Sequence, residues 1–507
     1  MAGWSSLQLP QSCSPWAWKR STRLGKSPRF IIIGLVVLVI LLSGLLASHP
    51  KSRGYFMDFY NSKPKGEGEK KLDELSEHQR KILALGPPDH HAIREYEKTL
   101  PQHNLNLPLP EGKGGRYVKF SNQIRMLGWN NCFNEVLMNA HLAYMSGRAY
   151  VFQDYVWKWD YYPWPPEQFL DDPPRTPLNA IISGPTAGGL WEEGDNAPRS
   201  ITEDWFEVVC PQSERRVINT RDVKPAVYWE SGNVIFEHWR KLLTEAPERC
   251  IEIWPASREE DGYGQTFDLW LWGTDRILTL WESFLNSPTS RLLGTSPLVN
   301  SAIDRNEYLF FPHGPRNTKA SPNPWNRMMA MHVRRGDYSD ACKGLATWNS
   351  TFYSWNLLPF LPDLFTPPPG GEWGKNTPEN EAAYMVHCLP TFDFIVQKVR
   401  DSRRDYIAEG AKKGENRELD IMYLLTNDQG EFLDKLKSAL MADGWHTIRT
   451  SKDLVLDQDQ TDVSMAVDMD IARRAAVFIG NGWSSFTSNI NHRRLKDGKE
   501  PISIRFF

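Results

Sequence analysis

The chain contains 507 residues, of which 40% are hydrophobic and 24% are charged, and its formal net charge is −3 at pH 7. This length exceeds what a single hydrophobic core usually spans, so at least two domains are expected. The near-neutral charge argues against a nucleic-acid-binding protein, which presents a basic face. The composition is that of a globular chain and not of a disordered one.

An uncharged apolar segment near the N-terminus predicts a membrane anchor. It runs from Phe30 to Ala47, and as a helix it would measure about 27 Å, enough to cross a thin bilayer. Basic residues are concentrated before it, which places the N-terminal end in the cytosol. A cleaved signal peptide is the less favoured alternative, because the apolar run is long and no small-x-small cleavage site follows. We therefore expect a cytosolic tail at 1–29, a transmembrane anchor at 30–48 and a luminal remainder.

The cysteines agree with this topology of a single-pass type II protein in the Golgi or endoplasmic reticulum membrane. Of the six cysteines, Cys13 falls on the cytosolic side, and the other five allow at most two disulfides in an oxidising lumen. Cys210 with Cys250, and Cys342 with Cys388, are candidate pairs. The spacing does not determine their connectivity.

Residues 49–114 are expected to form a stem between the membrane and the folded part. This stretch contains a segment dense in Lys, Glu and Gly, followed by Pro-rich segments, and such a composition buries little apolar surface. His90 and His91 lie here, and we expect them to be solvated loop residues and not metal ligands.

An alternation of apolar strands and amphipathic helices follows the stem and predicts an α/β fold. In the first unit, a helix at 131–145 and a strand at 149–152 open a Rossmann-like arrangement. Residues 153–200 are rich in Pro, Trp, Gly and Asp and are expected to be loops. A further helix is expected at 267–285.

The second unit shows the same alternation of strands and helices. Two such units predict a GT-B architecture, in which two Rossmann-like domains face a cleft. We place an N-terminal acceptor domain at 115–325 and a C-terminal nucleotide-sugar-binding domain at 326–507. The expected strands of the second unit are 328–333, 421–426, 446–449 and 477–480, and its expected helices are 392–408, 431–441 and 468–476.

Two adjacent arginines follow the first strand of the second unit. His332, Arg334, Arg335 and Asp337 belong to the sequence His-Val-Arg-Arg-Gly-Asp at the carboxyl end of that strand, where open α/β sheets bind ligands. Transfer from a nucleotide sugar builds negative charge on the departing diphosphate, and Arg supplies a fixed cationic fork for it. The alternative is a surface Arg pair held by Asp337, and this motif alone does not separate the two.

A second candidate site lies near the C-terminus. There a helix containing Asp468 leads into an apolar strand, which ends in a turn with Ser484, Ser485 and Phe486. Amides and hydroxyls of such a turn bind phosphate oxygens, assisted by the dipole of the next helix. The Asp468 carboxylate can accept hydrogen bonds from a guanine edge. The alternative is a serine-rich helix cap without a ligand.

Together the two motifs resemble those of the GDP-fucose protein O-fucosyltransferases and their fucosyltransferase relatives. That superfamily carries a His-x-Arg-Arg-type motif at the start of its second domain. Near its end it has an Asp, then a Phe-Ile-Gly strand end and a Ser-Ser/Thr-Phe-Ser/Thr turn. Here Asp468 precedes Phe478 by ten residues, and the turn Ser484 to Thr487 follows at the expected place. The strong resemblance covers the C-terminal half.

The N-terminal half resembles the family less closely. The family has a Gly-x-Asn-Gln-like loop before its first helix, with an Asn that reaches the donor. Here 126–131 stands at that place, with Asn130 as the best match and Asn131 next. Glu135, one turn into the helix, is the candidate acceptor base, and the alternative for it is a solvated or capping carboxylate.

The resemblance implies roles for these residues. Arg334 would hold the β-phosphate, His332 and Asp468 would bind the nucleotide, and the serine-phenylalanine turn would line the phosphate and base pocket. The predicted catalytic residues are Arg334 and Glu135, and the predicted donor-binding residues are Asn130, Asn131, His332, Arg335, Asp337, Asp468, Ser484, Ser485 and Phe486.

Metal-dependent GT-A transferases use an Asp-x-Asp pair, and the chain has two such pairs. Asp468 and Asp470 lie on a predicted helix and would point about 200° apart, so they cannot share an ion. Asp457 and Asp459 lie in a predicted loop near the C-terminus, a position that argues against a GT-A role. We therefore expect no metal.

The sequence predicts an inverting, metal-independent glycosyltransferase that moves fucose from GDP-fucose to an acceptor hydroxyl, without a further cofactor. A protein Ser/Thr, a glycan and a small molecule are all open as acceptors. Two alternatives stay open: a GT-B transferase using another nucleotide sugar, and a non-catalytic sugar-binding or scaffold protein with the same fold. The expected partners are the donor, the acceptor and the membrane, with no nucleic acid.

Overall fold

The computed structural model describes residues 76–123, 127–158, 162–164, 168, 173–311, 323–336, 338–428 and 430–507, which all belong to one compact unit. The predicted cytosolic tail at 1–29, the membrane anchor at 30–48 and the first part of the predicted stem lie outside these residues, and so does Asp337. Within the described ranges, no helix combines the length and the apolar composition that crossing a bilayer requires.

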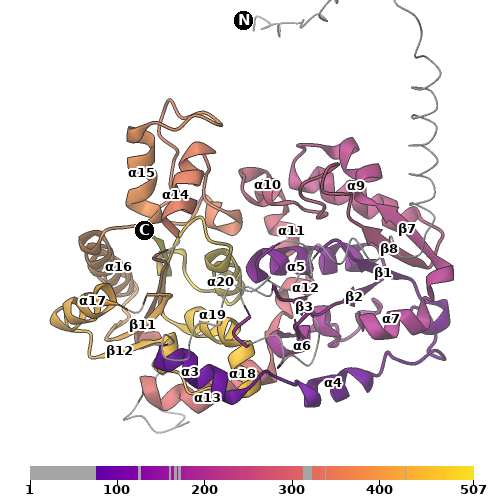
Figure 1. Cartoon of the computed structure of the whole chain (residues 1–507), viewed down its shortest axis with the longest axis horizontal. Coiled ribbons are helices and arrows are strands. Elements are labelled where there is room, and N and C mark those ends of the chain that lie inside the picture. The colour runs from indigo at the N-terminus through magenta and orange to yellow at the C-terminus, as the bar shows by residue number, and fades with distance from the viewer. Residues whose placement is uncertain are drawn as a thin grey trace, which may run out of the picture. The chain divides into compact units, whose positions relative to one another are not determined.

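A five-stranded parallel sheet organises the N-terminal half (Figure 1). Its strand order is β6-β2-β1-β8-β7, and helix α5 (Trp129–Met145) follows β1 and leads to β2. The expected helix at 131–145 and the expected strand at 149–152 are thereby confirmed. The strands are β1 (Tyr117–Phe120), β2 (Ala149–Phe152), β6 (Ile201–Thr202), β7 (Arg215–Asn219) and β8 (Cys250–Trp254).

A second five-stranded parallel sheet, in the order β12-β11-β10-β13-β14, organises the C-terminal half. All strands and helices that the sequence predicts here are present. The strands were predictable because strands covered on both faces read as continuous apolar runs. Along the chain, the strands of the first sheet come before the domain boundary expected between 325 and 326, and the strands of the second sheet come after it. The elements are β10 (Met328–Val333), β11 (Ile421–Thr426), β12 (Thr447–Thr450), β13 (Val477–Gly480), β14 (Ile504–Phe506), α16 (Phe392–Lys412), α17 (Glu431–Ala442), α19 (Ser464–Arg474) and α20 (Ser485–Lys496).

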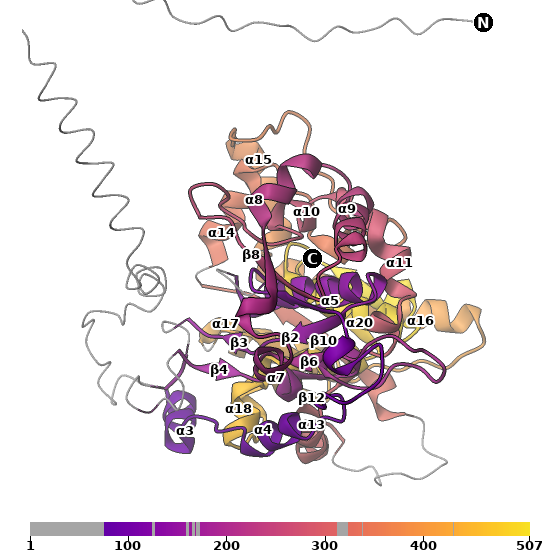
Figure 2. The ribbon, with the colours of Figure 1, turned by 90° about the vertical axis from the view of Figure 1, so that its right-hand side faces the viewer.

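Helices α5 and α20 lie side by side where the two halves meet (Figures 1 and 2). Helix α20 is almost wholly buried although much of it is polar, because its polar groups find partners. His492 Nε2 lies 2.7 Å from Ser290 Oγ, and Arg494 donates to several backbone carbonyl oxygens, among them Ala475 O at 2.6 Å. This packing holds the start of each helix in place relative to the other.

The remaining elements connect and cover the two sheets. The described residues of 153–200, expected to be loops, contain three short strands, a one-turn α-helix and a 3₁₀ helix (Pro185–Ala187), so that expectation is correct only for the other described residues of this range. The short strands are β3 (Tyr155–Val156), β4 (Arg175–Thr176), β5 (Ile182–Ser183) and β9 (Gly294–Thr295), and the other helices are α3 (Glu77–Leu85), α4 (His91–Lys98), α6 (Leu178–Ile181), α7 (Glu203–Val209), α8 (Thr220–Val223), α9 (Gly232–Glu245), α12 (Pro288–Arg291), α13 (Pro297–Phe310), α14 (Tyr338–Thr347), α15 (Pro378–Cys388) and α18 (Gln458–Asp462).

The prediction of a single helix at 267–285 is wrong, because this segment forms three separate helical pieces. It forms α10 (Leu269–Trp272), a 3₁₀ helix (Asp275–Leu280) and α11 (Trp281–Leu285). Thr274 takes an extended backbone with φ −136° and ψ 164°, so Gly273 ends α10. The Trp270 carbonyl oxygen at this helix end accepts hydrogen bonds from Arg276 Nη2 at 3.0 Å and from Thr274 Oγ1 at 3.2 Å.

The expectation of an unpacked stem over 49–114 is also wrong for its described part. Residues from 76 onward contain two helices and pack onto the rest of the protein. His90, expected to be solvated, is 3% exposed, and its Nε2 lies 2.8 Å from Asp462 Oδ2. Gln102 is buried and donates to the carbonyl oxygens of Gly188 (2.9 Å) and Ser200 (2.8 Å). Such partners are far away in sequence, so composition cannot reveal them.

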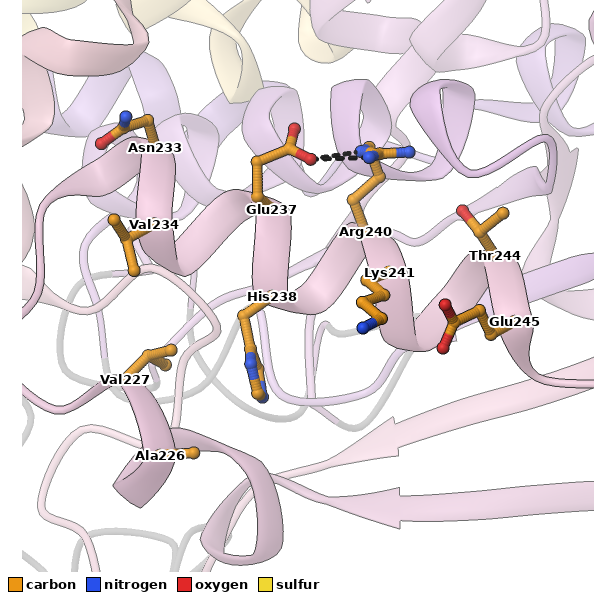
Figure 3. A pocket seen from close by; sticks show the side chains of 10 residues that line it. All are labelled: Ala226, Val227, Asn233, Val234, Glu237, His238, Arg240, Lys241, Thr244 and Glu245. Carbon is orange, nitrogen blue, oxygen red and sulfur yellow. Dashed lines mark hydrogen bonds and ion pairs between the residues drawn. The ribbon is translucent and has the colours of Figure 1, made fainter.

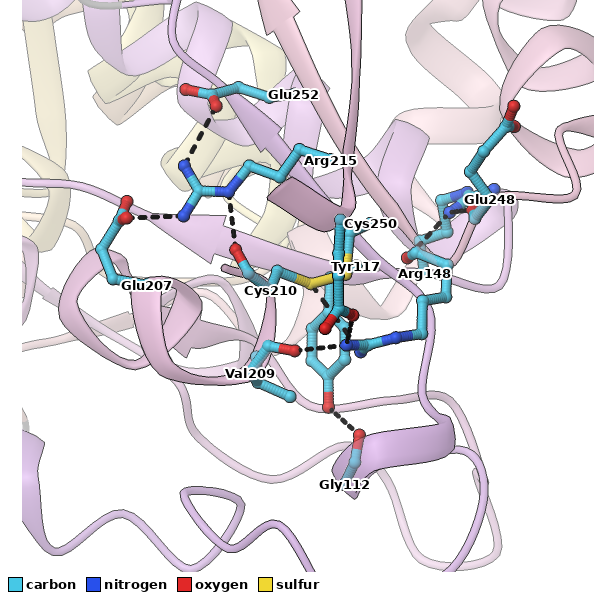
Figure 4. The surroundings of a disulfide bond; sticks show 12 residues. Gly112, Tyr117, Arg148, Glu207, Val209, Cys210, Arg215, Glu248, Cys250 and Glu252 are labelled. Atoms are coloured by element: carbon cyan, nitrogen blue, oxygen red, sulfur yellow. Dashed lines mark hydrogen bonds and ion pairs between the residues drawn. A yellow bond between two sulfur atoms is a disulfide. The ribbon is translucent and has the colours of Figure 1, made fainter. Parts of the chain in front are cut away.

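Two disulfides join the pairs suggested by the sequence. Cys210 bonds to Cys250 and Cys342 bonds to Cys388. Beside the first, Arg215 donates to the Cys210 carbonyl oxygen (2.6 Å) and to Glu252 (3.2 Å), as Figure 4 shows. Among the described cysteines, a buried Cys132 keeps its thiol.

Candidate active site

The two motifs of the C-terminal half lie against each other. His332 is near the end of β10, and its ring meets the ring of Phe486 edge-on, with 5.0 Å between centroids. Its Nδ1 lies 3.4 Å from Thr487 Oγ1. Burial, and then the nearby charge of Arg334, lower the pKa of His332 to about 4, so the imidazole is neutral at physiological pH. The carboxyl end of β10 and the start of α20 therefore form one site.

The turn before α20 presents a helix N-terminus to this site. Ser484 is the cap of α20, and its hydroxyl accepts a hydrogen bond from the Thr487 backbone N at 3.5 Å. Ser485 is the first helical residue, and both serines are half-buried. A Cβ at Gly482 would lie 2.3 Å from the Phe352 ring, so only glycine allows this close approach. The first amides and the dipole of this 12-residue helix favour an anion here.

Arg334 lies two residues beyond His332 and supplies a positive charge next to it. Its side chain is exposed, and the guanidinium carbon lies 5.3 Å from the centre of the Tyr338 ring. The charge of Arg334 is one of the two causes that lower the pKa of His332, which places the two groups within electrostatic reach of each other.

Arg335 contacts a different set of residues. Its guanidinium carbon lies 4.0 Å from the centre of the Phe432 ring, and its Nη2 donates to the Pro390 carbonyl oxygen at 2.6 Å. Its backbone N donates to Asn427 Oδ1 at 2.9 Å. Neighbouring residues of an extended segment point to opposite sides, which accounts for the different surroundings of Arg334 and Arg335. The structure thus does not bring the Arg335 side chain to the group around His332.

Asp468 accepts hydrogen bonds with both carboxylate oxygens. The Tyr423 hydroxyl donates to Oδ1, and Ser451 Oγ donates to Oδ2 at 2.7 Å. Burial raises the pKa of Asp468 to about 6, and the two hydrogen bonds oppose this rise. The carboxylate is therefore mostly ionised at neutral pH, and its remaining lone pairs can accept further hydrogen bonds.

Asn130 connects the N-terminal half to the C-terminal helices. Its Nδ2 lies 3.2 Å from Met465 Sδ, in the turn of α19 before Asp468. Asn489 of α20 donates from Nδ2 to the Asn130 carbonyl oxygen (3.0 Å) and to its Oδ1 (3.3 Å). Asn131, the next residue of α5, is half-buried. The start of α5 therefore lies where α19 and α20 come together.

Glu135 lies inside the protein and not on an open surface. Its side chain is 1% exposed, Oε1 accepts from the Phe267 backbone N at 2.7 Å, and Oε2 accepts from Asn139 Nδ2 at 3.0 Å. Burial raises its pKa to about 8 despite the opposing hydrogen bond from Phe267. The carboxyl is thus mainly protonated at neutral pH. Neither sequence-based interpretation, an accessible base or a solvated carboxylate, describes this environment.

The free energy of unfolding of a Glu135→Gln variant is expected to depend less on pH than that of the wild type. The folded protein keeps Glu135 protonated up to about pH 8, whereas the unfolded chain releases this proton near pH 4.5. Between these values the folded state binds the extra proton, so stability falls as pH rises, by up to about 1.4 kcal/mol per pH unit. Urea midpoints of both proteins across this interval test this. A variant that loses stability with pH as steeply as the wild type contradicts the assignment.

The sequence-based prediction passed over Asn122 and Gln123, which lie one residue beyond the end of β1. Both side chains are 0% exposed. Asn122 Nδ2 donates to the Gly264 carbonyl oxygen and to Thr266 Oγ1, each at 3.1 Å, while its buried Oδ1 has no partner among the described residues. The available signal was an Asn-Gln pair immediately after an apolar strand. It matches the Asn-Gln of a Gly-x-Asn-Gln-like pattern, but Phe120 stands where that pattern has glycine, whereas Asn130 is preceded by Gly128 at the matching place.

Neither Asp-x-Asp pair has its carboxylates directed at a common point. Asp470 is 0% exposed and pairs with three arginines, whereas Asp468 binds Tyr423 and Ser451. Asp457, which caps α18 and so does not lie in a plain loop, accepts from the Gln460 backbone N at 2.9 Å. Asp459 accepts from the backbone N of His90 at 3.3 Å. In the described part of the chain, no three His, Cys, Asp or Glu side chains are grouped as metal ligands are.

A surface depression along α9 is separate from these residues. Figure 3 shows its charged side chains, among them Glu237, which accepts a hydrogen bond from Arg240 Nε at 2.7 Å. None of its lining residues belongs to the predicted site. Its lining residues are Ala226, Val227, Asn233, Val234, Glu237, His238, Arg240, Lys241, Thr244 and Glu245.

Comparison with known proteins finds similarity at the level of structure only. No family model and no curated protein matches the sequence. The structure of POFUT1 in complex with GDP-fucose is 13% identical, with a TM-score of 0.41, over 77% of this chain and 97% of that one. A mutant of Arabidopsis thaliana FUT1 in complex with GDP is 10% identical, with a TM-score of 0.32, over 87% of this chain and 81% of that one. The likeness is to fucosyltransferases, and at these scores it carries no residue roles over to the chain.

Proposed function

We propose that the chain is a glycosyltransferase that binds GDP-fucose at the carboxyl end of the second sheet and transfers fucose to an acceptor hydroxyl. One observation carries the proposal: His332, near the end of β10, lies directly against the N-terminus of α20, and Arg334 is within electrostatic reach of His332. A guanidinium and a helix N-terminus in one place form a site for a diphosphate. The resemblance of the two motifs to those of GDP-fucose-dependent enzymes suggests the nucleotide and the sugar.

The proposed reaction is inverting and metal-independent. Arg334 and the amides of α20 offset the charge that develops on GDP as the bond to fucose breaks. In this proposal the ionised carboxylate of Asp468 accepts hydrogen bonds from the guanine edge, and neutral His332 binds the nucleotide near the end of β10. The acceptor domain would be 115–325, the donor domain 326–507, and the active part luminal behind an N-terminal anchor.

Glu135 has a positioning role in this proposal. Its carboxyl holds the Phe267 backbone N, next to Thr266, whose hydroxyl accepts from Asn122. A base must reach the acceptor hydroxyl, and a side chain that is 1% exposed does not do so in this structure.

Calorimetric titration with GDP, GDP-fucose and UDP tests the donor. GDP and GDP-fucose are expected to bind, with UDP weaker by at least about tenfold, because UDP lacks the guanine donors that Asp468 accepts. An Asp468→Asn variant should lose about tenfold in GDP affinity and little in its weak UDP affinity. A preference for UDP would favour a transferase with another donor, and no binding of any nucleotide would favour the non-catalytic alternative.

A further inference from the structure

Two tryptophan rings from opposite halves of the chain meet at the surface. Trp270 of α10 and Trp373 of the loop before α15 lie with their rings at 64° and 5.0 Å between centroids. Trp373 is 61% exposed, and Trp270 is half-buried. Tyr263 adds a third ring, edge-on to Trp270 at 5.7 Å. Solvent-exposed aromatic rings in contact with one another offer a flat apolar surface for a ligand.

Backbone contacts on both sides hold this aromatic group in place. The Trp270 backbone N donates to Asp268 Oδ1 (3.1 Å), and its carbonyl oxygen accepts from Arg276 Nη2 (3.0 Å). On the other side, the Gly374 backbone N donates to the Thr347 carbonyl oxygen at 2.8 Å, which ties the Trp373 loop to the end of α14. The rings are thus preorganised, which lowers the entropic cost of binding.

Helix α14 runs between this aromatic group and the candidate active site. It begins at Tyr338, whose ring lies 5.3 Å from the guanidinium carbon of Arg334, and it ends at Thr347, which holds the Trp373 loop. Its 10 residues span about 15 Å. Both views show α10 beside α14 and α15 (Figures 1 and 2).

A second connection reaches the aromatic group from the N-terminal half. Thr266, whose hydroxyl accepts from Asn122, lies four residues before Trp270 on the same segment. One end of this segment holds the buried Asn122, and the other end contributes a ring of the aromatic group.

We propose that Trp270, Trp373 and Tyr263 form a binding surface for an oligosaccharide acceptor, an inference that rests on the proposed function. A pyranose has an apolar face of C–H groups, which stacks on an aromatic ring, and a rim of hydroxyls, which needs polar partners. Charged groups lie beside the rings: Lys224 Nζ is 2.6 Å from Asp261 and 3.2 Å from Asp268. A chain of a few sugar residues spans the length of α14, so its end reaches Arg334.

An extended peptide suits this surface less well. Peptides in extended form usually add a strand to an open sheet edge. Between β8 and α10, where Tyr263 lies, the structure has no strand to offer such an edge. A saccharide needs ring faces and polar side chains, and both are present.

A glycan array tests this inference with the folded protein. The array carries N-glycans, O-glycans and glucan oligosaccharides, with unglycosylated Ser/Thr peptides on the same slide. The wild type is expected to bind a group of the oligosaccharides and not the peptides. Trp373→Ala should lower that signal about tenfold, whereas Trp373→Phe, which keeps a ring, should retain most of it. Tyr96→Ala, which removes a ring that is 52% exposed on α4, is the control and should bind like the wild type.

The outcomes separate this inference from the proposed function. Equal binding of peptides, no binding of oligosaccharides, or unchanged oligosaccharide binding by Trp373→Ala overturns the acceptor inference. None of these affects the donor site, which GDP titration measures on the same variants. Trp373→Ala is expected to bind GDP like the wild type, and a loss of GDP binding in that variant would mean that the fold has changed and not the acceptor surface.

Discussion

An Arg334→Ala variant is expected to release GDP from GDP-fucose at least about a hundredfold more slowly than the wild type, with an almost unchanged melting temperature. The side chain is exposed, so truncation removes little buried area. In the proposed reaction its guanidinium acts on charge that develops on the departing diphosphate. The loss should therefore appear mainly in kcat and less in the KM for the donor. Steady-state measurement of GDP release, beside a thermal denaturation curve, checks both parts.

The neighbouring arginine supplies a matched control. Arg335→Ala removes a guanidinium that packs on Phe432 and holds the Pro390 carbonyl oxygen, so it should lower the melting temperature and leave kcat of the folded fraction nearly unchanged. Arg334→Lys keeps the charge without the fork and should fall between the wild type and Arg334→Ala. If Arg334→Ala unfolds the protein, or if only Arg335→Ala loses activity, Arg334 does not have the proposed role.

An Asp470→Asn variant is expected to be less stable than the wild type by about 3–5 kcal/mol. Asp470 is 0% exposed, and its carboxylate pairs with Arg473 (2.8 Å), Arg474 (2.7 Å) and Arg493 (3.0 Å). Removing its charge takes the carboxylate partner from Arg474 and Arg493, whereas Arg473 keeps Asp497 at 2.5 Å, and the Arg493 side chain is almost completely buried. Urea unfolding at neutral pH measures the difference, and Asp468→Asn, two residues away, should cost clearly less.

The same variant has a defined dependence on pH. Burial disfavours ionisation of Asp470, but the charges of Arg493, Arg474 and Arg473 outweigh it and lower the pKa to about 2. An unfolded aspartate has a pKa of 3.8. The stabilisation by Asp470 is thus complete above the unfolded value and is lost as pH falls toward about 2. The difference between wild type and Asp470→Asn should shrink in this acidic range. A difference that is small at pH 7 or constant with pH would contradict the role of this network.

Much of the C-terminal half could be predicted because its signals are local. The strand at Met328–Val333 and the strand at Val477–Gly480 read as apolar runs, and the residues after each strand face the same edge of a parallel sheet. That is why His332 and Phe486, far apart in the sequence, could be expected in one site. The disulfide partners could be suggested because the two cysteines of each pair lie in the same predicted domain.

The N-terminal half was predicted less well, because its important contacts are made over long distances in sequence. Glu135 reads as a surface carboxylate on a helix, but the structure buries it and gives it hydrogen bonds from Phe267 and Asn139. Asn122 is distinguished by its partners at Gly264 and Thr266, which no local pattern specifies. The segment at 76–114 looks like a spacer until its hydrogen bonds to distant residues are known.

By itself, the sequence determined the chain order of four strands of the second sheet and the positions of two motifs at strand ends, since both follow from hydrophobic periodicity and chain direction. It did not predict β14, α14 or α15. Only the tertiary structure decided which arginine stands beside His332, which carboxylate is buried and protonated, and that tryptophans from both halves share one surface. These properties depend on which side chains meet across the fold, and burial, pKa and exposure are set by those neighbours.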